Sequence, residues 1–194
     1  MIEEICAGKR YIICGFDESH KGDSIYPDKP EIIVGVFSEN ILDGIPELGK
    51  HKRDFEGARE WMEQEKDWWF SLLRGEKYKN IPCNLSYEAP KLISQFLEKK
   101  GWNNNYEKMK EDKVHLGIHL DGEACEDYES KIISHFSLLP FEEIKAKNYI
   151  KSRDENGRFI QPRIVKIADA IGNKLYHFSL EELFNHPRLV YVAD

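Results

Sequence analysis

The segment that most constrains the fold is residues 10–19, which reads RYIICGFDES. Its apolar side chains follow one another with little alternation, a pattern typical of a central strand that is covered on both faces. Asp17 and Glu18 come at the end of this run. In open α/β sheets, functional groups gather at the carboxyl ends of strands. The segment therefore predicts a buried central strand that ends either in a functional site or in an ordinary turn.

Length and composition bound the class of protein. A chain of 194 residues with 41% hydrophobic residues can bury a substantial core, and we expect a single domain over residues 1–194. No apolar run reaches the roughly 18 residues that span a bilayer, and there is no signal-peptide pattern. We therefore expect a cytoplasmic protein with no membrane association. The cysteines form no CxxC pair, so we expect reduced and mostly buried thiols.

Periodicity along the rest of the chain predicts further elements. Residues 31–37 predict a second apolar strand that forms a hairpin with the first across a turn-rich connection. The other expected strands, of which the first is ambiguous, lie within residues 77–88, 114–120 and 141–147. Apolar residues at helical spacing predict helices at residues 54–74, 90–101, 124–136 and 162–178, whereas the polar residues 102–112 predict a loop.

The helix expected at residues 54–74 is unusually aromatic because it carries Trp61, Trp68 and Trp69. Core packing is one explanation for these side chains, and a surface for dimerisation or base stacking is the other. A homodimer is the assembly that such a surface would form.

Three acidic residues lie in elements that the fold could bring together. Asp17 ends the first strand, Asp121 follows the strand at 114–120, and Asp169 lies at the margin of the apolar stripe of the last helix. A single Asp after a strand is usually a turn residue or a helix cap. Three acids in these elements together predict a site.

The order of elements resembles the ribonuclease H-like superfamily, in which the first strand, the fourth strand and the last helix each contribute an acidic residue. More narrowly, GFDES at 15–19, LD at 120–121 and IADAI at 167–171 resemble the three motif blocks of the uncharacterised DUF3800 family. The resemblance implies an α/β, ribonuclease H-like fold. It would have a mixed five-stranded sheet flanked by helices, with the Trp-rich helix as an insertion.

Carboxylates that converge suit hard divalent cations, because Mg²⁺ and Mn²⁺ prefer oxygen ligands. Two such ions roughly 4 Å apart stabilise the attacking and leaving oxygens in phosphodiester hydrolysis. We therefore predict a nuclease-like phosphodiester hydrolase that acts on nucleic acid with Mg²⁺ or Mn²⁺. Asp17 would bridge the ions, and Asp121 and Asp169 would each hold one.

Four neighbouring residues are auxiliary candidates for this site. One or the other of the two acidic residues would be a further metal ligand. One or the other of the two histidines would carry protons, because histidine titrates near neutrality. They are Glu18, Glu123, His20 and His119.

The net charge of −7 argues against a protein that coats nucleic acid generally, although the basic groups of a nuclease can be local. One stretch is locally basic and would hold the phosphate backbone without reading sequence. Its members are Lys145, Lys147, Lys151, Arg153, Arg158, Arg163 and Lys166. A solvated loop is the alternative for this stretch.

Two further hypotheses stay open. His115, His119 and Asp121 share one face of their predicted strand and could be zinc ligands. The protein could also be a non-catalytic ribonuclease H-like scaffold or a protein-interaction module, because fold alone does not determine function.

Overall fold

The computed structural model describes residues 10–19, 30–39, 59, 61–64, 66–74, 84–122, 125–149, 155 and 162–193. Their strands form one mixed sheet of six strands in the order β5-β4-β1-β2-β3-β6. In chain order the strands are β1 (Tyr11–Ser19), β2 (Glu31–Ser38), β3 (Trp68–Leu73), β4 (His115–Asp121), β5 (Glu143–Asn148) and β6 (Leu189–Ala193). The α/β class is confirmed, and the sheet has one strand more than the five expected.

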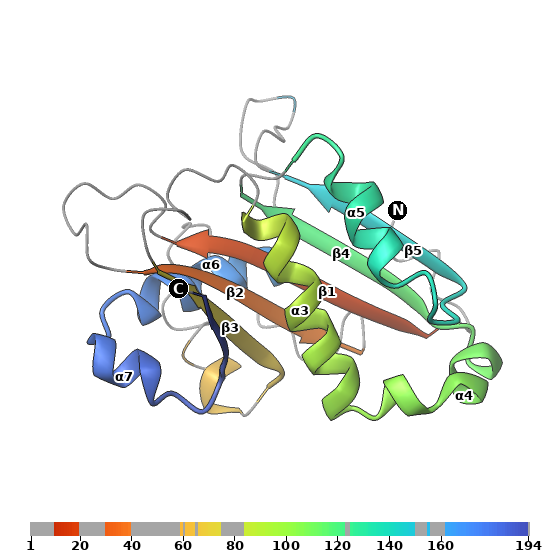
Figure 1. The fold of residues 1–194 in the computed structure, drawn as a ribbon, viewed down its shortest axis with the longest axis horizontal. Coiled ribbons are helices and arrows are strands. Elements are labelled where there is room, and N and C mark those ends of the chain that lie inside the picture. The colour runs from red at the N-terminus through yellow and green to blue at the C-terminus, as the bar shows by residue number, and fades with distance from the viewer. Residues whose placement is uncertain are drawn as a thin grey trace.

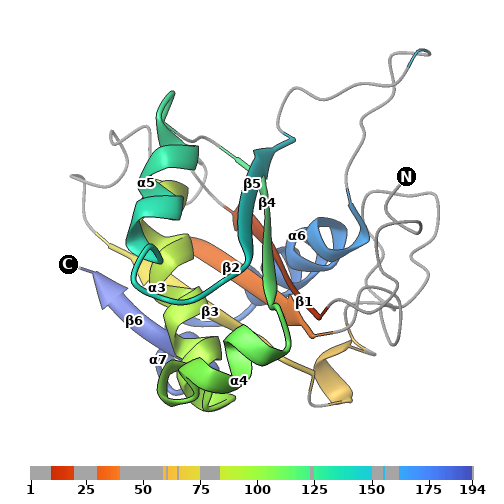
Figure 2. The same ribbon diagram turned by 90° about the vertical axis from the view of Figure 1, so that its right-hand side faces the viewer.

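Helices cover both faces of this sheet. Those described are α3 (Asn84–Lys99), the 3₁₀ helix η2 (Trp102–Asn104), α4 (Tyr106–Glu111), α5 (Tyr128–His135), α6 (Arg163–Leu175) and α7 (Leu180–Phe184). Figures 1 and 2 show α3 and α5 on one face and α6 on the other. Among the helices described, none is long and apolar enough to cross a bilayer.

The first three strands form an antiparallel meander, and β4 and β5 run parallel to β1. The predicted hairpin and the strands predicted at 114–120 and 141–147 are therefore confirmed. The edge strand β6 pairs in parallel with β3 and was not predicted. Its residues 189–193 become a strand because β3 offers them an open edge.

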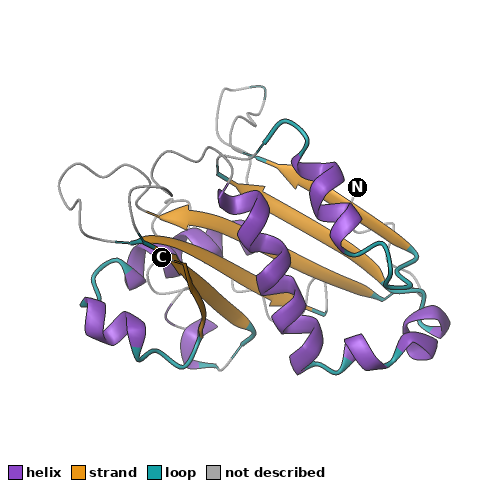
Figure 3. Cartoon of the chain, viewed as in Figure 1, coloured by secondary structure: helices purple, strands orange, loops and turns teal. Residues whose placement is uncertain are grey.

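The prediction of a helix over residues 54–74 is wrong for its second half. Trp68–Leu73 is the strand β3, buried at all six positions between β2 and β6, whereas residues 61–63 are helical (Figure 3). A strand covered on both faces is apolar at nearly every position, as β3 is apart from Ser71, so it also satisfies helical spacing. Within the described residues there is thus no Trp-rich inserted helix.

Three other differences from the predictions concern the helices. The helix predicted from residue 90 begins at Asn84, so residues 84–88 are helical and not part of a strand, and Pro90 lies inside α3. The loop predicted at 102–112 contains η2 and α4. Helix α7 was missed, although Ser179 and Glu182 form a capping box at its start.

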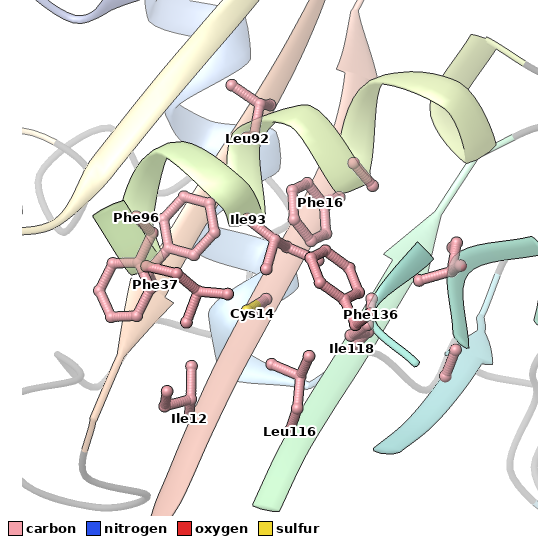
Figure 4. Packing of buried hydrophobic residues seen from close by; sticks show 14 of the residues in the cluster. Ile12, Cys14, Phe16, Phe37, Leu92, Ile93, Phe96, Leu116, Ile118 and Phe136 are labelled. Carbon is pink, nitrogen blue, oxygen red and sulfur yellow. The ribbon is translucent and has the colours of Figure 1, made fainter. Parts of the chain in front are cut away.

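Two hydrophobic layers hold the helices to the sheet. On β1, Ile12, Cys14 and Phe16 belong to the layer under α3, which Figure 4 shows with Leu92 and Ile93 of that helix. The neighbouring positions of β1 therefore face α6, because side chains alternate along a strand. This alternation assigns Gly15, Asp17 and Ser19 to the α6 face.

The three tryptophans are core residues. Trp61 and Trp68 are 2% exposed and pack in the α6 layer, and Trp69 is 5% exposed and packs in the α3 layer. The core explanation is confirmed for them, and the surface explanation is wrong. A homodimer stays a prediction without these side chains as its basis.

The prediction of reduced thiols holds for one cysteine and fails for another. Cys14 is buried and free, and burial raises the pKa of its thiol. Cys125 is disulfide-bonded, and its partner lies outside the described residues. The sequence could not indicate this bond, because the cysteines approach only through the fold.

Candidate functional site

Asp17 and Asp121 are brought side by side by the pairing of β1 with β4. The two strands are parallel, and the register sets Asp17 directly opposite Asp121. Paired residues on neighbouring strands point to the same face and lie roughly 5 Å apart. Leu116, Ile118 and Leu120 of β4 belong to the α3 layer, so Asp121 points to the α6 face as Asp17 does.

Helix α6 lies on this face of the sheet, along β1 and in close contact with it. A Cβ atom at Gly15 would lie 2.6 Å from the backbone carbonyl carbon of Ile164, so only glycine admits the first turn of α6. A Cβ atom at Gly172 would lie 2.7 Å from the Ser19 hydroxyl oxygen. These two contacts place the helix along the strand, running in the direction of β1.

Between these two contacts lies Asp169. From Ile164 to Asp169 the helix rises roughly 7.5 Å, and from Gly15 to Asp17 the strand rises roughly 6.7 Å. The backbones of Asp17 and Asp169 are therefore level with each other along β1. The first strand, the fourth strand and the last long helix thus carry their acidic residues to one level of one face.

The Asp169 side chain is buried, with 8% exposure. Its Oδ1 accepts a hydrogen bond of 2.8 Å from the side-chain amide of Asn173, one turn later. Its Oδ2 is buried and has no hydrogen-bond partner among the described residues. Asn173 was not among the predicted site residues, although its spacing of four residues from Asp169 in a helix was the signal that could have identified it.

This buried oxygen is the observation that tests the fit of a metal ion. A buried carboxylate oxygen without a partner is unfavourable, and a divalent cation would satisfy it.

Two of the auxiliary candidates, Glu123 and His20, lie outside the described residues. In the part of the chain that is described, no three His, Cys, Asp or Glu side chains form a group that could hold an ion.

Glu18 lies on the opposite face of the sheet from Asp17. A Cβ atom at Gly122 would lie 2.9 Å from the Glu18 side chain and 2.9 Å from Leu85, which belongs to the α3 layer. Consecutive residues of a strand point to opposite faces, which is the physical reason. The structure therefore does not bring the Glu18 carboxylate together with those of Asp17 and Asp121.

His119 points to the same face as Asp121 but is held in a different environment. Its Nδ1 lies 3.2 Å from the Tyr149 hydroxyl oxygen. Burial, and then the charge of Lys147, lower the pKa of His119 to about 4. The imidazole is therefore neutral at pH 7. The expectation that it titrates near neutrality and so carries protons is wrong.

The proposed zinc ligands do not form one site. His115 and His119 are four residues apart on β4, which separates their backbones by roughly 13 Å. The ring of His115 stacks on Tyr11 at 4.8 Å, at the far end of β1 from Asp17. The two histidines therefore cannot share an ion, and the zinc hypothesis is wrong.

Two residues of the basic stretch lie on the α6 face of the sheet. Ile144 and Ala146 of β5 pack in the α3 layer, so Lys145 and Lys147 point to the α6 face, where both are exposed. Lys147 lies opposite His119 in the β4–β5 register, and its Nζ is 4.9 Å from the centre of the Tyr149 ring.

The remaining basic candidates are less informative. Lys145 forms an ion pair of 2.8 Å with Glu143. Arg163 and Lys166 lie on α6, where Arg163 is exposed and Lys166 half-buried. The other three, Lys151, Arg153 and Arg158, lie outside the described residues.

The depressed pKa of His119 predicts how stability depends on pH. Its pKa of about 4 lies below the value of about 6.5 expected in the unfolded chain, so below pH 6.5 the unfolded chain binds the proton more readily. This contribution is complete above pH 6.5 and declines as pH falls towards 4. Between pH 7 and pH 5 we expect His119 to account for a loss of about 2 kcal/mol of unfolding free energy.

Urea denaturation at the two pH values would measure this loss. His119→Gln should lose about 2 kcal/mol less than the wild type over this range. His135→Gln, which changes an exposed histidine of α5, is the control and should behave as the wild type does. Equal losses in the wild type and His119→Gln would contradict the prediction.

Comparisons of this chain with protein-family models, with curated proteins and with solved structures find no match.

Proposed function

We propose that this protein is a divalent-metal-dependent, nuclease-like phosphodiester hydrolase that acts on nucleic acid. The observation that carries the proposal is the pairing of Asp17 with Asp121 in the β1–β4 register. Asp169 lies level with this pair on the helix that covers β1, and one of its carboxylate oxygens is buried without a partner among the described residues. In the described structure Asp17, Asp121 and Asp169 do not form a group that could hold an ion. Mg²⁺ and Mn²⁺ prefer carboxylate oxygens, so in this proposal a bound ion would draw the three side chains together.

The sheet supports a ribonuclease H-like fold. Strands β3, β2, β1, β4 and β5 are consecutive neighbours, and the first three form an antiparallel meander. That superfamily has a mixed five-stranded sheet that begins with a meander and takes acids from its first strand, fourth strand and last helix. The present chain adds β6 at the free edge of β3.

Each group has a distinct role in this proposal. Asp17, Asp121 and Asp169 would hold Mg²⁺ or Mn²⁺, which supplies charge stabilisation to the phosphoryl oxygens and activates water. Lys147, exposed on the same face, would hold a phosphate of the backbone and contribute affinity without sequence reading. The neutral His119 would orient a polar group by hydrogen bonding, because it does not protonate near pH 7.

Hydrolysis of labelled DNA and RNA oligonucleotides in Mn²⁺ tests the proposal. We expect wild-type cleavage that EDTA abolishes, and a loss of at least about 100-fold in Asp17→Asn, because removing a charged ligand removes a metal position. Asp127→Asn, which changes an exposed acid before α5, should cleave as the wild type does.

Two results would overturn the proposal. One is the absence of cleavage on all substrates in Mg²⁺ and in Mn²⁺, which would favour a non-catalytic scaffold or a protein-interaction module. The other is equal cleavage by the wild type and Asp17→Asn, which would indicate a contaminating nuclease.

A further inference from the structure

Asn173 makes two hydrogen bonds to a single residue. Its Nδ2 donates to the Asp169 side-chain Oδ1 at 2.8 Å and to the Asp169 backbone oxygen at 2.8 Å. Both acceptors lack a proton to donate, so the amide must turn its nitrogen towards them. One oxygen of the Asp169 carboxylate is thus tied to α6 itself.

The second carboxylate oxygen of Asp169 does not take part in these hydrogen bonds. Oδ2 of Asp169 is buried and has no hydrogen-bond partner among the residues that the structure describes. If Asn173 were absent, rotation of the carboxylate could exchange the two oxygens. The amide therefore distinguishes them: Oδ1 is occupied, and Oδ2 remains as the ligand oxygen.

We propose that Asn173 is a positioning residue that orients Asp169 so that Oδ2 binds the divalent cation. The inference rests on the proposed function, because it concerns the same metal site. Carboxylates that bind metals are commonly held by hydrogen bonds from a second layer of residues, and loss of such a partner typically weakens metal binding 10- to 100-fold. Asn173 is half-buried on α6 and contacts Asp169 through its amide nitrogen, which is a donor and cannot bind a cation.

A purely structural role for Asn173 makes a different prediction. An amide that bonds the carbonyl four residues earlier could simply support the helix. Asn185 makes this bond alone, since its Nδ2 donates to the Glu181 backbone oxygen at 3.0 Å. Asn185→Ala is therefore a matched control that removes the same backbone bond at a distance from the site.

Calorimetric titration of Mn²⁺ into the full chain tests the inference without any measurement of activity. We expect Asn173→Ala to bind Mn²⁺ about 10-fold more weakly than the wild type. Asn185→Ala should bind as the wild type does, and Asp169→Asn should show no saturable binding. Asn173→Gln keeps an amide at a spacing that bonds Asp in helices. It should therefore recover an affinity within about threefold of the wild type, which a general effect on the helix would not produce.

The outcomes separate this inference from the proposed function. If Asp169→Asn loses binding but Asn173→Ala keeps wild-type affinity, the positioning role is overturned and the metal site stands. Equal weakening in Asn173→Ala and Asn173→Gln also overturns the positioning role. If the wild type itself binds no Mn²⁺, both the site and the positioning role fail.

Discussion

Gly15→Ala is expected to destabilise the protein by about 2–4 kcal/mol, because the new methyl group has no room. It would lie 2.6 Å from the carbonyl carbon and 2.7 Å from the carbonyl oxygen of Ile164. Those atoms belong to the backbone of α6, so no side-chain rotation can relieve the contact. The helix has to move away from β1, which loosens the hydrophobic layer that holds it.

Gly117→Ala is the matched control for this change. Gly117 lies on the neighbouring strand β4, faces the same side, and is paired with Ile13 of β1. A Cβ atom there would lie no closer than 3.7 Å to any other atom, which is ordinary contact. We expect a change in stability within about 1 kcal/mol.

Urea denaturation would measure both variants. For a chain of this size the loss in Gly15→Ala corresponds to a fall of roughly 5–15 °C in melting temperature. Equal stability of Gly15→Ala and Gly117→Ala would contradict the close approach of α6 to β1. Because Asp17 is two residues beyond Gly15, we also expect Gly15→Ala to weaken Mn²⁺ binding.

The second large effect is stabilisation of the folded protein by manganese. An ion that binds only the folded state, at 100 times its dissociation constant, adds about 2.7 kcal/mol to the unfolding free energy. For the wild type we therefore expect the melting temperature to rise by roughly 5–10 °C. Asp17→Asn should show no such rise, because it removes one of the two carboxylates that the β1–β4 register sets side by side.

Thermal denaturation in EDTA and in Mn²⁺, at matched ionic strength, separates this effect from a general loss of folding. In EDTA we expect Asp17→Asn to melt within a few degrees of the wild type, because the amide has the shape of the carboxylate. The exposed Asp127→Asn should gain as much from Mn²⁺ as the wild type. An equal rise in the wild type and Asp17→Asn would contradict a metal site at Asp17.

Several elements could be predicted from sequence because their patterns are local. Apolar residues form a continuous run on β1, alternate with other residues on β4 and recur at helical spacing on α6. Each of these patterns lies within one element, so it can be recognised without knowing the neighbouring elements. Asp121 could be assigned to the end of its strand for the same reason. The prediction that Asp17 ends the first strand is wrong, because β1 continues to Ser19 through its pairing with β2. The placement of Glu18 and Asp17 on opposite faces of the sheet also follows from a local rule, because consecutive residues of a strand point to opposite faces.

Strand β3 shows where local patterns fail. Its six residues are buried on both faces, so their apolar character carries no period that separates strand from helix. Only the positions of β2 and β6 on either side make residues 68–73 extended. The edge strand β6 likewise exists because β3 leaves hydrogen-bonding groups for it to pair with.

The amino-acid sequence by itself determined that the chain is α/β and that three of its central elements carry an acidic residue. Only the tertiary structure decided that Asp17 and Asp121 are register partners and that Asp169 lies level with them. It also decided that His119 is neutral at pH 7, through burial and the neighbouring Lys147. The reason is physical: register, helix position and burial depend on contacts between segments far apart in the chain.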